Sequence, residues 1–170
     1  MSKIRIAGYV KHSMVNGPGV RFVLFTQGCP HFCHGCQNPE TWSMQGGEEW
    51  ETSDIVALVK QTGYLDGFTF SGGDPLAQSG SCLLIAQALR EEKHINLWLY
   101  TGYTFEEVWA GAAGEDAKKL LQYIDVLVDG RYEEGLKATE GNCLYRGSTN
   151  QRLIDVQKSI RQGTAVEFVL

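Results

Sequence analysis

The sequence is organised around segment 28–38, which reads Gly28-Cys29-Pro30-His31-Phe32-Cys33-His34-Gly35-Cys36-Gln37-Asn38. It places three cysteines in a C-x3-C-x2-C pattern directly after the apolar run Phe22-Val23-Leu24-Phe25. Thiolates this close together on a loop can converge on one metal centre, but a closed zinc site or an all-cysteine iron–sulfur cluster requires four ligands. The pattern therefore indicates an iron–sulfur cluster with one open iron, which can bind a substrate or cofactor.

The alternative is a zinc knot whose fourth ligand is Cys82, Cys143, His31 or His34. The rest of the chain offers no second C-x2-C half-site at zinc spacing, and this favours the cluster. Cys82 and Cys143 are interpreted as packing residues, because free cysteine is commonly buried. His31 and His34 are interpreted as residues that shape the loop and the hydrogen bonding of the cluster.

Composition and charge are those of an ordinary globular chain. Its 170 residues fit a single domain, 1–170, and 43 % of them are hydrophobic and 21 % charged. A net charge of −5 and the lack of a basic run argue against a nucleic-acid surface. No apolar stretch approaches a membrane span and no signal-peptide core follows the first residues, so we expect a cytoplasmic protein. In a reducing compartment, five cysteines favour metal or redox chemistry over disulfides.

Apolar runs alternate with helical patterns along the chain. Extended segments are predicted over 4–10, 21–26, 67–70, 96–100 and 124–128, with a further edge strand over 165–169. A helix capped by Thr52 or Ser53 should end at Gly63, and others are predicted over 83–92 and 117–123. Thr104 and Glu107 match a capping box at the start of a short helix. Segment 153–160 fits either type, and the alternation as a whole predicts a parallel α/β sheet.

Four motifs come directly after predicted strands. They are the cysteine loop, Ser71-Gly72-Gly73-Asp74-Pro75, Thr101-Gly102-Tyr103 and Asp129-Gly130-Arg131. Because the carboxyl ends of parallel strands meet at one edge, we expect all four motifs on one rim. A full (β/α)8 barrel needs about 250 residues, so this chain can close only part of one. The open side of such a partial barrel suits a macromolecular substrate.

The string Gly28-Cys29-x3-Cys33-x-Gly35-Cys36-x-Asn38 resembles the cluster loop of the radical S-adenosylmethionine (SAM) enzymes. Among them it is similar to the activases of glycyl-radical proteins, above all those of anaerobic ribonucleoside-triphosphate reductase. Gly35 replaces the aromatic residue of many radical SAM loops but fits the anaerobic reductase activases. The resemblance covers most of 15–150. It implies a partial parallel β/α barrel of the radical SAM type, with SAM and a [4Fe–4S] cluster on Cys29, Cys33 and Cys36 as cofactors.

The turn after the second buried strand is also part of the resemblance. Ser71, Gly72, Gly73 and Asp74 resemble the radical SAM motif that holds the amino group of the methionine moiety, where Glu is more frequent at the last position. Its two glycines can expose bare backbone to a ligand. Taken alone, the same residues would be an ordinary strand-to-helix turn.

Three more residues receive binding roles from the resemblance. Asn38 matches a polar position that contacts the nucleoside; its other interpretation is a loop cap before Pro39. Asp129 and Arg131 fall where related activases place a polar residue and a cation near the ribose and the methionine carboxylate. Arg131 could pair with that carboxylate through a charge-assisted bond, or it could form a surface salt bridge.

The resemblance implies reductive cleavage of SAM and hydrogen abstraction from a glycine of anaerobic ribonucleoside-triphosphate reductase. A low-potential electron donor such as flavodoxin or ferredoxin would supply the electron. No catalytic residue is expected beyond the cluster and SAM. The alternatives are an activase of another glycyl-radical enzyme, another small radical SAM enzyme, or a non-catalytic iron–sulfur or zinc protein.

Overall fold

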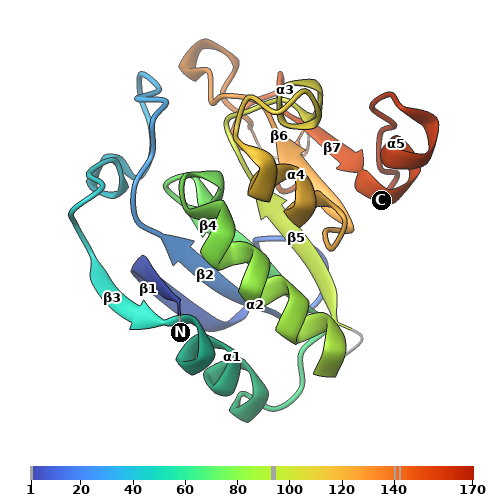
Figure 1. The fold of residues 1–170 in the computed structure, drawn as a ribbon. Helices are drawn as coiled ribbons and strands as arrows, with labels where there is room; N and C mark the ends of the chain where they lie inside the picture. Colours follow the sequence, from blue (N-terminus) through green and yellow to red (C-terminus); the bar gives the residue numbers. More distant parts are fainter. Residues whose placement is uncertain (1, 93–94, 140, 142) are drawn as a thin grey trace.

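A seven-stranded sheet in the order β3-β1-β2-β4-β5-β6-β7 organises the computed structural model, which describes residues 2–92, 95–139, 141 and 143–170 (Figure 1). Strands β2, β4, β5 and β6 are parallel, whereas β1 and β7 run antiparallel to β2 and β6 and β3 runs antiparallel to β1. The bounds are β1 Lys3–Ser13, β2 Arg21–Thr26, β3 Glu48–Glu51, β4 Gly67–Gly72, β5 Asn96–Tyr100, β6 Val126–Asp129 and β7 Arg152–Asp155.

The central strands are those that the apolar runs predicted. They lie between neighbours and are buried on both faces, so their sequences are almost continuously apolar. The sheet does not close on itself, since β3 and β7 are its two edges. The predicted partial barrel is confirmed, with a parallel centre.

The edges of the sheet add antiparallel strands to the predicted parallel sheet. β3 was missing from it, because the sequence Glu48-Glu49-Trp50-Glu51 lacks an apolar pattern and the strand pairs with one neighbour only. The ambiguous segment 153–160 divides between β7 and the helix that follows it. Segment 165–169 contributes a single bridge, from Glu167 to Ile154, instead of an edge strand.

Helices cover one face of the sheet (Figure 1). Their bounds are α1 Thr52–Gln61, α2 Ser79–Glu92, α3 Phe105–Trp109, α4 Glu115–Leu121 and α5 Val156–Gln162. The capping box is confirmed, because Thr104 N donates to Glu107 Oε2 at 2.8 Å and Glu107 N donates to Thr104 Oγ1 at 3.2 Å. The N-cap of α1 is Glu51 instead of Thr52 or Ser53, since β3 runs directly into the helix.

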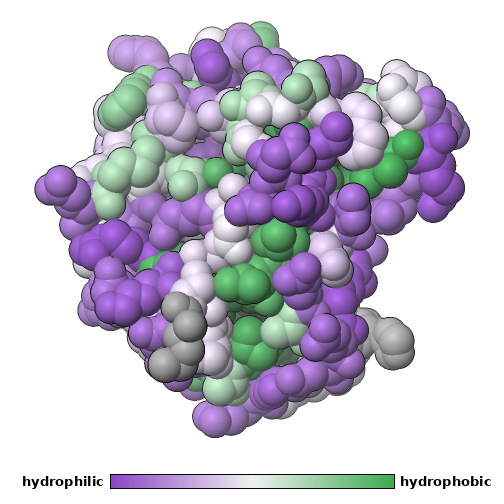
Figure 2. All heavy atoms as spheres, in the orientation of Figure 1, coloured by the Kyte–Doolittle hydropathy of each residue, from purple (hydrophilic) through white to green (hydrophobic). Residues whose placement is uncertain are grey.

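The surface over these helices is mainly hydrophilic. Figure 2 shows a hydrophobic strip near the centre of this face, in the region of α2, where Leu84 is 45 % exposed. Beneath the helices lies the larger hydrophobic core, which packs them onto the sheet. Of the described helices, none combines the length and the apolar character needed to cross a membrane.

The other face of the sheet carries a smaller core around Trp98, packed against Tyr145 and Phe168. Arg21, the first residue of β2, is buried beside Trp98 with its guanidinium 5.4 Å from the ring centroid. It donates to Thr69 Oγ1 at 2.8 Å, and burial lowers its pKa to about 10. Arg21 therefore fills the amino end of the sheet interior, and the carboxyl end is left for a site.

Candidate cluster and cofactor site

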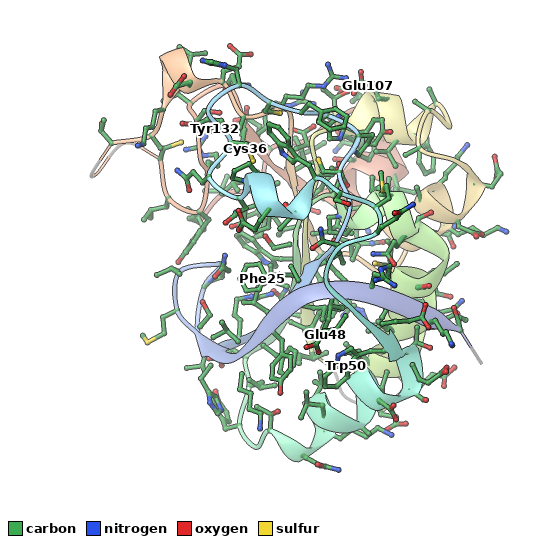
Figure 3. The ribbon with its side chains drawn as sticks, turned by 90° about the vertical axis from the view of Figure 1, so that its left-hand side faces the viewer. Phe25, Cys36, Glu48, Trp50, Glu107 and Tyr132 are labelled. Atoms are coloured by element: carbon green, nitrogen blue, oxygen red, sulfur yellow. The ribbon has the colours of Figure 1, made fainter. Side chains whose placement is uncertain are left out.

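A cavity of about 390 Å³ opens at the carboxyl ends of β2, β4, β5 and β6. All four of the predicted motifs contribute to its wall, as do two loops from elsewhere in the chain. Figure 3 shows Cys36 and Tyr132 close together above Phe25, and all three line the cavity. The lining residues are Val15, Asn16, Phe25, Cys29, His31, Cys33, Cys36, Gln37, Asn38, Ser71, Gly72, Gly73, Tyr100, Thr101, Gly102, Gly130, Tyr132, Tyr145, Arg146, Gly147 and Gln151.

The three cysteines of the loop all line this cavity as free thiols. Cys29 is buried, whereas Cys33 and Cys36 are half-buried. Desolvation raises the pKa of Cys29 and of Cys33, and the positive charge of a metal would favour their thiolate forms. In the described part of the chain, no three His, Cys, Asp or Glu side chains are already grouped closely enough to hold a metal.

Each candidate for the fourth ligand of a zinc site contacts another protein group. Cys82 is fully buried with Sγ 3.5 Å from Pro75 O, and Cys143 Sγ lies 3.6 Å from Ser148 O. His34 is exposed and pairs with Glu134 at 3.1 Å. His31 lines the cavity, but its Nε2 lies 2.6 Å from Asp74 Oδ2. A set of three thiols facing one cavity fits a cluster with an open iron better than a closed zinc site.

Close backbone packing joins the cysteine loop to the 71–74 turn. Asp74 N donates to Gly28 O at 2.8 Å, and Gly28 N donates to Thr41 O at 2.7 Å. A Cβ on Gly73 would lie 2.3 Å from Gly28 O, and one on Gly72, where φ is +100°, would lie 2.4 Å from Thr26 N. The glycines are thus required for this packing in addition to exposing backbone to the cavity.

Asp74 itself lies behind the cavity wall. Its carboxylate is fully buried, and Oδ2 accepts from Thr101 Oγ1 at 2.8 Å and from Gly102 N at 3.0 Å, besides its contact with His31. Oδ1 accepts from Leu76 N at 2.9 Å. Asp74 is not among the residues that line the cavity, and its carboxylate faces the cysteine loop and the 101–102 turn. A contact of this side chain with the ligand stays a prediction.

Asp129 is buried in the same way. Its carboxylate accepts from Arg152 Nη2 at 2.6 Å, from Arg152 Nε at 3.0 Å and from Phe105 N at 2.7 Å. These contacts leave Asp129 outside the cavity lining, and its contact with the ribose stays a prediction. Arg131 is exposed, lies outside the lining, and exerts a charge effect that lowers the pKa of Cys33 against the larger effect of burial. Asn38 does line the cavity, and its N–H lies 3.5 Å from Cys36 Sγ.

The 145–151 loop adds side chains to the cavity wall that the sequence analysis did not single out. Arg146 is the only Lys or Arg among the described lining residues, and its buried Nε has no hydrogen-bond partner there. Gln151 fixes the loop, because its Oε1 accepts from Gly147 N at 2.8 Å and its Nε2 donates to Gly130 O at 2.9 Å. Only the fold shows that Arg146 lines the cavity.

Comparisons with known proteins agree with this geometry. Residues 15–154 match the family described as "4Fe-4S single cluster domain". The anaerobic ribonucleoside-triphosphate reductase-activating protein of Enterobacteria phage T4 is 38 % identical over 146 residues, which cover 82 % of this chain and 86 % of that protein. The protein of that name from Vibrio cholerae is 39 % identical over 150 residues, covering 84 % and 92 %. The one from Escherichia coli K12 is 34 % identical over 150 residues, covering 84 % and 93 %.

Among solved structures, QueE from Escherichia coli aligns with a TM-score of 0.48 and 17 % identity, covering 60 % of this chain and 53 % of that one. A likeness at this level adds nothing to the assignment, which comes from the sequence relatives. Their identity extends over nearly their whole length. The resemblance seen in the cysteine loop is therefore confirmed, and the chain belongs to the family of anaerobic ribonucleoside-triphosphate reductase-activating proteins.

Proposed function

We propose that this protein activates anaerobic ribonucleoside-triphosphate reductase by forming a glycyl radical on it. With one electron from a donor, the bound cluster and SAM supply methionine and a 5′-deoxyadenosyl radical, which becomes 5′-deoxyadenosine by taking a hydrogen atom from a glycine Cα of the reductase. The observation that carries the proposal is the single cavity shared by three free thiols and the glycine turn after β4.

Cys29, Cys33 and Cys36 hold the cluster in this proposal. Their loop begins at a fixed point, because Cys29 N donates to Trp42 O at 3.2 Å while the later cysteines lie on more exposed chain. A rigid first ligand followed by two adaptable ones allows the loop to close around the irons. Three cysteine ligands would leave one iron of a [4Fe–4S] cluster without a protein ligand, and that iron would be open to SAM.

SAM then lies along the cavity wall. Ser71, Gly72 and Gly73 offer backbone and hydroxyl groups to its methionine end, and Asn38 offers an amide to its nucleoside. Asp74 and Asp129 support these contacts from behind the wall, through the turns that they fix.

Two arginines are candidates for pairing with the methionine carboxylate. Arg131 was selected by the resemblance, and its exposed side chain lies close enough to Cys33 to influence the pKa of that thiol. Arg146 lines the cavity and has an unused buried donor. A buried guanidinium donor without a partner is costly, and a carboxylate is the group that best satisfies it. We assign the direct contact to Arg146 and a longer-range charge effect to Arg131.

The proposal also covers the location of the protein, the access of the reductase and the source of the electron. The chain acts as one domain in the cytoplasm, and the open side of its sheet admits the glycine-bearing segment of the reductase. The electron comes from a low-potential donor such as flavodoxin or ferredoxin. A reaction within a reducing compartment is consistent with five cysteines that are all free.

The test is electron paramagnetic resonance on an anaerobic mixture of reconstituted protein, reductant, SAM and the candidate reductase. We expect a glycyl-radical doublet that requires all four components. If 5′-deoxyadenosine forms without a doublet, the protein is a radical SAM enzyme with another target. If neither product forms although the cluster is intact, the proposal is wrong and a non-catalytic iron–sulfur protein is the better description.

A further inference from the structure

The buried pair of His31 and Asp74 connects the cysteine loop to the turn after β4. The two side chains are 4 % and 0 % exposed, and His31 Nε2 lies 2.6 Å from Asp74 Oδ2. His31 stands between the first two cysteines of the loop, whereas Asp74 belongs to the rim of the sheet. This contact is therefore a direct link from the rigid sheet to the loop that carries the thiols.

The other donors around Asp74 indicate which group is the donor in the His31–Asp74 hydrogen bond. Oδ2 already accepts from Thr101 Oγ1 and from Gly102 N, so it acts as an acceptor, and His31 Nε2 is assigned as the third donor. Two of these donors belong to the 101–102 turn on the rim, and the third belongs to the cysteine loop. A carboxylate with three donors on one oxygen is held firmly in place.

Packing fixes the imidazole of His31 from its other sides. The ring meets Tyr103 edge to face with centroids 4.7 Å apart. A Cβ on Gly102 would lie 2.4 Å from His31 Cδ2, so the backbone of the 101–103 turn lies directly against the ring. After His31 the loop becomes exposed: Phe32 is 62 % exposed and adopts a φ of +50°. His31 is the last firmly buried residue before Cys33.

We propose that Asp74 is a positioning residue for the cysteine loop. Acting through His31, it keeps Cys29 and Cys33 facing the cavity, in place of contacting SAM with its own carboxylate. The inference rests on the cluster-binding part of the proposed function. It predicts that loss of Asp74 and loss of His31 have the same effect on the loop, whether or not SAM is present.

The first measurement is amide hydrogen exchange of segment 28–36 in the protein without a cluster. We expect Asp74→Asn and His31→Leu each to accelerate exchange there by about tenfold, the ratio that corresponds to losing a buried hydrogen bond to a charged group. The double variant should exchange no faster than the faster single variant, because both changes break one link. His31→Gln retains a donor near the position of Nε2 and should remain close to the wild type.

Asp125→Asn is the matched control. Asp125 also accepts from a backbone N–H and from an arginine, with Leu97 N at 2.7 Å and Arg90 Nη2 at 2.6 Å, but it lies just before β6, away from the loop. Its substitution should leave the exchange of 28–36 unchanged. If it accelerates exchange as much as Asp74→Asn does, the effect is general loosening and the inference is wrong.

The second measurement is iron content after anaerobic reconstitution, followed by SAM affinity of the fraction with a full cluster. Asp74→Asn and His31→Leu should both lower the iron content, and the loaded fraction should bind SAM within about twofold of the wild type. A direct ligand role predicts the reverse: full iron content in both variants and weaker SAM binding in Asp74→Asn alone. If the wild type itself failed to load a cluster, the proposed function would fall, and the exchange measurement would still test the link.

Discussion

The carboxyl ends of β4 and β6 carry two carboxylates that are alike in burial and different in partners: Asp74 two residues after β4 and Asp129 as the last residue of β6. Asp74 is 0 % exposed and bonds to His31 of the cysteine loop and to the 101–102 turn. Asp129 is 1 % exposed and bonds to Arg152 of β7 and to Phe105 N at the start of α3. Both lie at the carboxyl ends of parallel strands, and both resembled residues that contact SAM.

The difference shows that a place on the rim does not define a role. Asp129 holds an antiparallel edge strand and a short helix in position, so it supports the wall of the sheet. Asp74 fixes the loop that carries the proposed cluster ligands. The partner of each carboxylate, more than its location, determines which part of the molecule it serves.

The largest effect on activity is expected in the cysteine loop, which Asp74 contacts through His31. Replacing Cys29, Cys33 or Cys36 by Ala should reduce formation of 5′-deoxyadenosine to the background, because each thiolate holds one iron and the cluster requires all three. Cys143→Ala is the control, since its thiol lies on the side of the 145–151 loop and faces Ser148 O. Cleavage of SAM by any one of the three loop variants would show that the ligand assignment is wrong.

The next effect is a loss of stability around Asp129, which binds Arg152 of β7 and Phe105 N of α3. Asp129→Asn should lower the free energy of unfolding by about 2–3 kcal/mol, because the half-exposed Arg152 and the buried Phe105 N lose a charged acceptor. Urea unfolding measures this loss, and exchange of segment 28–36 should remain that of the wild type. A faster-exchanging cysteine loop in this variant would remove the distinction between the two carboxylates.

A smaller effect compares the two arginines near these turns. Arg146→Gln should weaken binding of SAM to the cluster-loaded protein roughly tenfold, which corresponds to about 1.4 kcal/mol for a lost charged pair. Arg131→Gln should change it less, since that side chain lies outside the cavity lining. Calorimetric titration with SAM decides between them, and a larger loss in Arg131→Gln would restore the assignment drawn from the resemblance.

The smallest effect is a dependence of stability on pH. Hydrogen bonding to Arg152 lowers the pKa of Glu106 below its ordinary value of 4.5. The ionised form is therefore favoured by folding, so its stabilisation is complete above the unfolded pKa and is lost as the pH falls through the lower, folded one. Glu106→Gln should reduce the loss of stability on acidification by less than about 1 kcal/mol, because the pair is partly exposed. Unfolding curves between pH 3 and pH 6 that match those of the wild type would contradict this.

Much of the central architecture was predictable because its signals are local. The apolar runs at β2 and β5 matched the observed strands, since a strand covered on both faces needs an apolar side chain at almost every position. The capping box at Thr104 was predictable for a similar reason: its two hydrogen bonds join residues three apart. β3 was not, because its Glu-rich sequence is held by pairing with β1, far away in the chain.

The site likewise has parts that local sequence signals predict and parts that depend on contacts between distant segments. The sequence by itself determined the three thiols, their spacing, the glycine turn and the family, because these are properties of short segments. Only the tertiary structure decided that Asp74 faces His31, that Asp129 faces Arg152 and that Arg146 enters the cavity. A carboxylate takes its role from the donors that surround it. Apart from Leu76 N, the donors of Asp74 and Asp129 lie 23 to 43 residues away in the chain and are brought together by strand order and packing.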